Sequence, residues 1–268
     1  SLILLRMIRF IFILITCSFF IVSCKKEGCT DSQANNYNPN ANEDDGSCTY
    51  TSDILQLDIE PEYGAQSFYL DSAYLTTEGY LVKFTEIKFY ISELKNGIDT
   101  LCKAALFDLR ETDNFVFSSP GDFSKYQNLS GNIGIDSLIN HSDPSAFDNE
   151  SPLNISNAGL MHWGWNPGYI FIDIQGKVDT LANGNNFDHN FVFHVGTDSF
   201  KKTFALNNLV WIPMDNGSKL ILNLDLNTFL NNNGSTIDLK QEFFTHSGSG
   251  DLVLTEKLAT NFLNALTP

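Results

Sequence analysis

Apolar and polar residues alternate through much of the chain after residue 52, and this pattern predicts β-strands. In residues 54–60, Leu55, Leu57 and Ile59 alternate with polar residues, which is typical of a half-buried strand. Residues 219–226 repeat the pattern with a leucine at every second position. Turn-forming residues separate the other segments that we interpret as strands, which are 68–75, 80–92, 100–109, 132–138, 168–175 and 190–196.

The end of the chain follows a different period. Leu254, Leu258, Phe262 and Leu266 recur at helical spacing, with Thr255 as a candidate cap, and predict one C-terminal helix. Regular strands separated by turns favour a sandwich over a parallel sheet. We therefore expect a mainly β fold, a single β-sandwich-like domain over residues 53–268 with one helix at its C-terminal end.

The first residues have the pattern of a secretory signal. Arg6 and Arg9 accompany a short apolar run that ends at Ser23, directly before Cys24, and Met7 is the expected start. The run is shorter than the roughly 20 residues that span a bilayer. Val-Ser-Cys resembles the bacterial lipobox, so we expect residues 1–23 to be removed and Cys24 to carry lipid. The alternative is an uncleaved anchor.

Residues 24–52 form the expected tether. Cys29 and Cys48 bracket a polar loop with few apolar residues, and we expect them to form a disulfide in an oxidising compartment. The loop resembles a module of exported Bacteroidetes proteins, which favours an outer-membrane lipoprotein on the periplasmic or cell-surface side. Its hard oxygen donors also allow a second interpretation, a calcium site that includes Asp31, Asp44 and Asp45.

The charge excludes one class of function. The chain carries a formal charge of −16, which becomes −18 after removal of residues 1–23, because that segment contains two arginines and no acids. Binding of nucleic acid requires a basic patch, so we expect no nucleic-acid partner, and the lipid alone would attach the protein to a membrane. The usual catalytic motifs are also missing from the sequence, so we do not expect an enzyme.

Two neighbouring segments contain residues suited to metal chemistry. Residues 158–171 include His162, Trp163 and Trp165 within four positions. His194 lies in the strand 190–196, on the face opposite its apolar neighbours. Each histidine is either a satisfied core residue or a metal ligand, and two imidazoles suit copper. The tryptophans could equally be core aromatics. The other histidines occupy polar segments that we interpret as solvated loops, with His189 as a substitute ligand: His141, His189 and His246.

Several segments, in order, resemble the MbnP-like family of copper-binding proteins, relatives of MopE. They are KFTEIKFYISELK, GNIGIDSLIN, GLMHWGWNPGYIFIDIQG, FVFHVG and EKLATNFLNAL, which lie between residues 83 and 266. The resemblance implies copper held by two histidines and by a tryptophan that a MauG-type diheme oxidase converts to kynurenine. On this chain it implies Trp163 or Trp165 as the modified residue, with His194 and His162 as ligands. Neighbours in a strand point to opposite faces, so His162 joins Trp163 only across a turn.

Two functions therefore follow from the sequence. The first is an exported lipoprotein that binds copper in copper acquisition or handling. The alternative is a surface or periplasmic binding module that keeps the same fold without a metal.

Overall fold

A computed structural model describes residues 25–31, 34, 36–49, 53–164, 168–247 and 251–268. The chain divides into two compact units, Ser1–Ser52 and Asp53–Pro268. The predicted signal segment 1–23 and the predicted lipidation site Cys24 lie outside the described residues. Within the described residues, no helix combines the length and the apolar character needed to cross a membrane.

The N-terminal unit contains the predicted disulfide between Cys29 and Cys48. Its acidic side chains support local turns. Asp44 accepts a hydrogen bond from the backbone N–H of Gly46 at 3.1 Å, and Asp45 accepts one from Ser47 at 2.9 Å. The disulfide and these turns give a short polar segment its local structure, because it has little apolar surface to bury.

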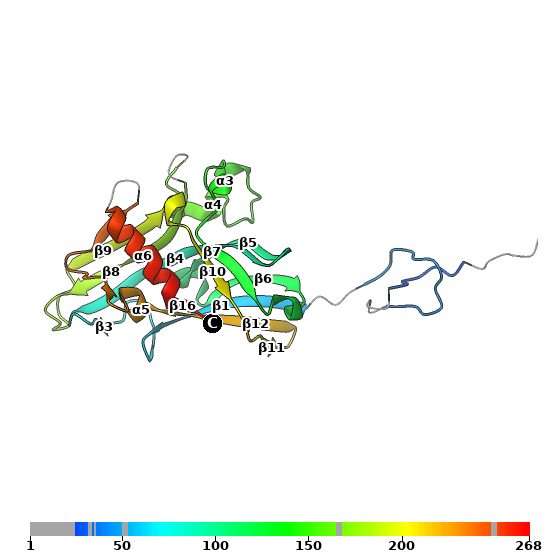
Figure 1. Cartoon of the computed structure of the whole chain (residues 1–268), viewed down its shortest axis with the longest axis horizontal. Coiled ribbons are helices and arrows are strands. Elements are labelled where there is room, and N and C mark those ends of the chain that lie inside the picture. Colours follow the sequence, from blue (N-terminus) through cyan, green and yellow to red (C-terminus); the bar gives the residue numbers. More distant parts are fainter. Residues whose placement is uncertain (1–24, 32–33, 35, 50–52, 165–167, 248–250) are drawn as a thin grey trace, which may run out of the picture. The chain divides into compact units, whose positions relative to one another are not determined.

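The first sheet of the larger unit is built around β1 (Asp53–Tyr63) and β12 (Gly217–Asp225) (Figure 1). These two strands pair in parallel, with Leu57 opposite Leu220. The apolar face predicted for β1 is confirmed, because Leu55, Leu57 and Ile59 are at most 1% exposed. The remaining strands of this sheet are β2 (Gln66–Ser67), β6 (Phe115–Gly121), β11 (Ile212–Met214) and β16 (Leu266–Thr267).

The second sheet contains the segments with candidate chemistry. Its strand order is β10 (Lys202–Leu206), β7 (Leu129–Ile133), β4 (Leu81–Asn96), β8 (Ile170–Asp179), β9 (His189–Gly196) and β15 (Phe244–His246). Two further strands, β3 (Tyr74–Leu75) and β5 (Asp99–Asp108), also pair with β4. All the neighbours in this order are antiparallel except β9 and β15, which run in parallel.

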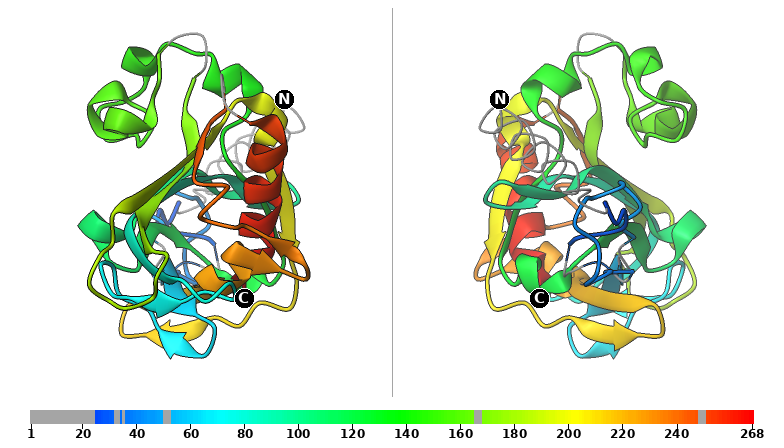
Figure 2. Two further views of the ribbon diagram at one scale, coloured as in Figure 1. Left: turned by 90° about the vertical axis from the view of Figure 1, so that its left-hand side faces the viewer. Right: turned by 90° about the vertical axis from the view of Figure 1, so that its right-hand side faces the viewer.

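The predicted C-terminal helix is α6, Leu252–Ala265, which lies across the curled sheets (Figure 2). It contacts strands of both sheets, and its Phe262 packs edge-on against Phe89 of β4 with ring centres 4.8 Å apart. Asp251, not the predicted Thr255, is its cap, and accepts hydrogen bonds from Val253 and Leu254 N–H. Thr255 lies inside the first turn, so its hydroxyl donates to the Asp251 carbonyl oxygen.

The expected single mainly β domain with one C-terminal helix is confirmed for residues 53–268, but three local predictions are wrong. Only Tyr74–Leu75 of the segment 68–75 is a strand. The strand predicted at 132–138 ends at Ile133, because Asp136 caps a short helix. The segment 113–128, which lies outside every predicted strand, contains β6. The short elements are α2 (Leu109–Thr112), η2 (Phe123–Tyr126), α3 (Ser137–Asn140), η3 (Pro144–Ala146), α4 (Ile155–Ala158), η4 (Gly159–Met161), η5 (Asp198–Phe200), α5 (Leu226–Leu230), β13 (Asn231–Asn232) and β14 (Ser235–Thr236).

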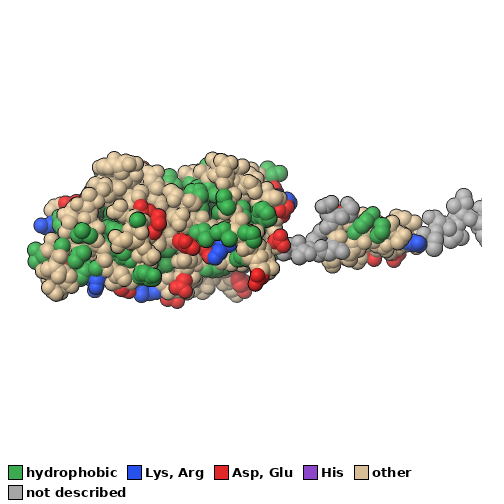
Figure 3. All heavy atoms as spheres, turned by 90° about the horizontal axis from the view of Figure 1, so that it is seen from below, with side chains coloured by type: hydrophobic (Ala, Val, Ile, Leu, Met, Phe, Trp, Pro, Cys, Tyr) green, Lys and Arg blue, Asp and Glu red, His purple; other side chains and the backbone are tan. Residues whose placement is uncertain are grey.

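Basic side chains are few and stand apart on the face of the larger unit that Figure 3 shows. Acidic residues outnumber basic ones two to one in the sequence, 32 against 16. This face therefore lacks the basic patch on which nucleic-acid binding depends.

Candidate metal centre

Three neighbouring strands place Asp173, His194 and His246 in one row across the second sheet. Asp173 of β8 lies opposite His194 of β9, and His194 lies opposite His246 of β15. Directly opposed residues project on the same face of a sheet, so the three side chains are neighbours. The alternate residues of β9 are buried in the core: Phe191, Phe193 and Val195.

The two histidine rings face each other through the same type of nitrogen. The distance from His194 Nδ1 to His246 Nδ1 is 3.2 Å. On the other side of its ring, His194 Nε2 lies 3.3 Å from Asp173 Oδ1 and 3.3 Å from Gln175 Nε2. One nitrogen of His194 therefore faces the second histidine and the other faces a carboxylate.

Trp163 completes the group of rings. Its ring centre lies 4.4 Å from that of His246 and 6.3 Å from that of His194. Gly196, which ends β9, makes room for the indole, because a Cβ at this position would lie 2.6 Å from Trp163 Cζ3. The backbone N–H of Trp163 donates a hydrogen bond to the Gly168 carbonyl oxygen at 2.9 Å, which holds Trp163 beside the residues that lead into β8.

The Ser247 side chain fastens β15 to β9. Its hydroxyl accepts a hydrogen bond from Gly196 N–H at 2.7 Å and donates one to the His194 carbonyl oxygen at 3.0 Å. Two residues before Ser247, the hydroxyls of Thr245 and Thr255 meet at 2.6 Å, which connects β15 to α6. These bonds fix His246 beside His194, although β15 itself is only three residues long.

The surroundings favour a neutral imidazole at His246. Burial lowers the pKa of His246 below its usual value, and the neighbouring His194 lowers it further. A protonated ring has no free lone pair, so a lowered pKa preserves the form that binds metals.

The structure brings together two of the four metal-site residues predicted from the sequence, Trp163 and His194. His162 faces a different environment, with its ring edge-on to Tyr169 at 4.7 Å and its Nδ1 accepting the Gly164 N–H at 3.1 Å. Burial lowers the pKa of His162. The fourth predicted residue, Trp165, lies outside the described residues.

His246 is not among the metal-site residues predicted from the sequence. We expected a solvated loop, but His246 is half-buried, lies in β15 and contacts both His194 and Trp163. A three-residue strand is too short for its alternation to be recognised, so the sequence carried no local signal. The two other histidines make hydrogen-bond contacts away from this group. His189 contacts the Leu239 carbonyl oxygen at 3.0 Å, and the exposed His141 contacts Asp198 at 3.1 Å.

The histidine pair alone does not make a complete metal site. Among the residues that the structure describes, no three His, Cys, Asp or Glu side chains converge to hold a metal ion. Two imidazole nitrogens do lie close together, and the ring of Trp163 lies beside them. Among the described residues, a third donor to a metal at this position would therefore be of another kind.

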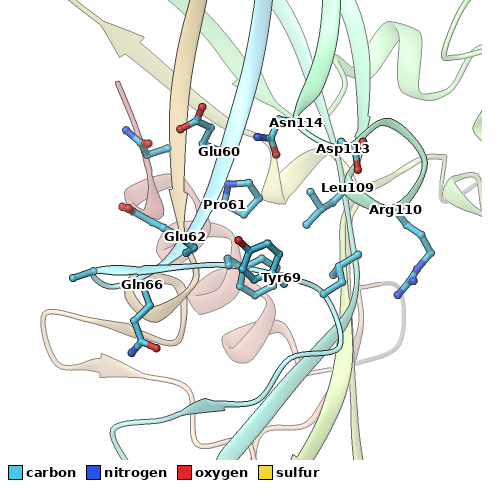
Figure 4. A pocket seen from close by; sticks show the side chains of 14 residues that line it. Glu60, Pro61, Glu62, Gln66, Tyr69, Leu109, Arg110, Asp113 and Asn114 are labelled. Carbon is cyan, nitrogen blue, oxygen red and sulfur yellow. The ribbon is translucent and has the colours of Figure 1, made fainter.

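A hollow of about 820 Å³ lies elsewhere, where β1, the segment after β2 and α2 meet (Figure 4). Tyr69, Leu109 and the carboxylates of Glu60 and Glu62 are among its lining residues. Its lining shares no residue with the histidine pair. The candidate metal centre is therefore a position on the face of the second sheet and not part of this hollow.

The sequence model of the MbnP family matches residues 52–248, which include Trp163, Asp173, His194 and His246. The chain belongs to the MbnP family. Among solved structures, MbnP from Methylosinus trichosporium is similar, with a TM-score of 0.45 and 14% sequence identity, over 70% of this chain and 79% of that chain. No curated protein matches the sequence. The match to the MbnP family ends at residue 248 and so leaves out α6, Leu252–Ala265.

Proposed function

We propose that this MbnP family member is an exported lipoprotein that binds copper between His194 and His246, in copper acquisition or handling. The observation that carries this proposal is the 3.2 Å distance between the two Nδ1 atoms, beside the ring of Trp163. The ligand pair differs from the pair expected from the sequence, because His246 takes the place assigned there to His162.

The distance suits two ligands of one ion. Imidazole nitrogens bind first-row metals at about 2.0–2.1 Å, and two such nitrogens at a tetrahedral angle are about 3.3 Å apart. The lowered pKa of His246 keeps its lone pair available. Copper heads the affinity order of the divalent metals at nitrogen sites. The separation of the two nitrogens therefore matches that of two ligands of one copper ion.

Trp163 is the candidate third donor. An intact indole N–H donates hydrogen bonds and has no lone pair for a metal. Oxidative opening of the indole ring gives N-formylkynurenine, and hydrolysis releases its C2 carbon as formate to leave kynurenine, whose aniline nitrogen can bind a metal. This conversion needs an external oxidant, and the partner that we propose for it is a MauG-type diheme oxidase. The 4.4 Å distance between the Trp163 and His246 rings supports Trp163, since the modified side chain would already lie beside the ligands.

The proposed cellular location is consistent with copper binding. A lipid on Cys24 would attach the protein to the outer membrane, and the Cys29–Cys48 disulfide suits an oxidising compartment. We propose a binding protein and not an enzyme, because the usual catalytic motifs are missing from the sequence.

The test is a copper titration of the full chain, with variants of each histidine. We expect His194→Ala and His246→Ala each to lower copper affinity at least about tenfold, because each removes one of the nitrogen ligands. His141→Ala is the matched control, since His141 is exposed and bound to Asp198. His162→Ala distinguishes the two ligand pairs. A loss with His162→Ala and none with His246→Ala would show that the pair expected from the sequence is the correct one.

The 3.2 Å distance also fits a hydrogen bond between two rings, which is the arrangement that a metal-free binding module would have. If the wild-type chain, expressed with the oxidase, retains unmodified tryptophans by intact mass and binds no copper, that second function holds and the copper proposal fails.

A further inference from the structure

We infer that Asp173 is the positioning residue of the centre: its carboxylate accepts a hydrogen bond from the Nε2–H of His194 when Nδ1 binds the metal. This inference rests on the proposed function and adds a residue to it. It concerns the side of His194 that faces away from His246.

The first step is the chemistry of the imidazole ring. A neutral imidazole carries one proton, so coordination through one nitrogen places the proton on the other. In His194, Nδ1 faces His246, and therefore Nε2 would carry the proton. The acceptor beside Nε2 is Asp173 Oδ1 at 3.3 Å. The remaining neighbour, Gln175 Nε2, is an amide nitrogen and can only donate.

The second step is the fixed position of the carboxylate. Gln175 lies two residues along β8, and its Nε2 donates to both Asp173 oxygens, at 2.9 and 3.1 Å. The Asp173 side chain is only 9% exposed. The β8–β9 register sets it directly opposite His194. The carboxylate is therefore immobilised before any metal binds.

The third step is the charge of Asp173. Lys88 lies opposite Asp173 on β4, but its ammonium group pairs with Glu86 at 2.7 Å and with Asp108 at 2.9 Å. Among the described residues, His194 is the basic partner within ion-pair distance of Asp173. A buried carboxylate without a full counter-charge is costly to keep. A cation bound through His194 would supply that positive charge and so stabilise the Asp173 carboxylate.

Two consequences follow for the centre. The carboxylate holds the His194 ring in the orientation that presents Nδ1, and it increases the basicity of that nitrogen. Loss of such an outer carboxylate lowers metal affinity by about 10–100-fold.

The test uses the full chain with Asp173→Asn and Asp173→Ala, and Asp99→Asn as the matched control. Asp99 is an exposed aspartate of the same sheet, so its variant changes the net charge equally. We expect about tenfold weaker copper binding for Asp173→Asn, up to about 100-fold for Asp173→Ala, and no change for the control. Gln175→Ala, which keeps the carboxylate but frees it, should give a smaller loss and serves if Asp173→Ala does not fold.

A spectroscopic measurement separates positioning from a loss of stability. Electron spin-echo modulation of the Cu(II)-loaded protein reports the remote, uncoordinated nitrogen of each bound imidazole. We expect the signal of one imidazole to change in Asp173→Asn and that of the other to stay constant. Loss of thermal stability alone would leave both signals as in the wild type.

The outcomes distinguish the role of Asp173 from copper binding itself. If the wild type binds copper and both Asp173 variants bind it equally well with unchanged nitrogen signals, the role of Asp173 is refuted while the proposed function stands. If the wild type binds no copper at all, the proposed function fails, and this inference fails with it.

Discussion

Replacement of Ser247 by alanine tests whether the short strand β15 is fastened as the structure indicates. The Ser247 hydroxyl is the acceptor for the Gly196 N–H at 2.7 Å, and both residues are buried. Alanine removes the acceptor and adds no bulk. The Gly196 N–H would then be buried without a hydrogen bond.

The cost follows from that single group. A buried donor that loses its acceptor destabilises a protein by about 1–3 kcal/mol. The hydroxyl also donates to the His194 carbonyl oxygen, but the Ser247 backbone N–H reaches the same oxygen at 3.3 Å and remains in the variant. The lost donation therefore adds little, and we expect the free energy of unfolding to fall by about 1–3 kcal/mol in total.

Urea unfolding followed by circular dichroism measures this change. With a urea dependence of about 2 kcal/mol per M, a loss of 2 kcal/mol lowers the unfolding midpoint by about 1 M. Ser118→Ala is the control, because Ser118 is an exposed serine in β6. A loss below about 0.5 kcal/mol, the range of ordinary surface substitutions, would refute the assigned role of this hydroxyl.

Three further predictions concern single residues. Gly196→Ala forces a Cβ to within 2.6 Å of Trp163 Cζ3 and should lower the free energy of unfolding by about 1–3 kcal/mol, measured by urea unfolding; an unchanged midpoint would contradict this contact. Burial lowers the pKa of His162 below 6.5 in the folded protein. As the pH falls, His162 is therefore protonated in the unfolded chain at a higher pH than in the folded protein. Metal-free stability should therefore fall as the pH drops below about 6.5, with a shallower fall in His162→Gln, as thermal melts at pH 5.5 and 7.5 would show. Burial raises the pKa of Cys102 from 9.0 to about 11, so alkylation of its thiol at pH 8, followed by mass spectrometry of the peptide that contains it, should be about 100-fold slower in the folded protein than in urea; equal rates would show an exposed thiol.

Much of the fold could be predicted from the sequence, because it depends on local alternation. The leucines of β12 and the aromatic face of β9 are buried as the period of two requires. The wrong predictions also concern short segments of the chain. The residues of 68–75 have strand-like composition, yet only Tyr74–Leu75 pairs with β4. Composition gives a tendency to form a strand, but a strand also needs a partner whose register it can match.

At the candidate metal centre, the contributions of the sequence and of the tertiary structure are easier to separate. The sequence by itself singled out Trp163 and His194 as candidates, because an unusual motif contains the first and a strongly alternating strand contains the second, and the structure places their rings near each other. Only the tertiary structure placed His246 beside His194, because it lies 52 residues further along the chain and meets His194 through a parallel pairing three residues long. The same holds for Asp173, whose opposition to His194 depends on the register between β8 and β9. Alternation along a chain fixes the face on which a side chain lies. Which side chains meet on that face depends on strand order and register, which arise from contacts between distant parts of the chain.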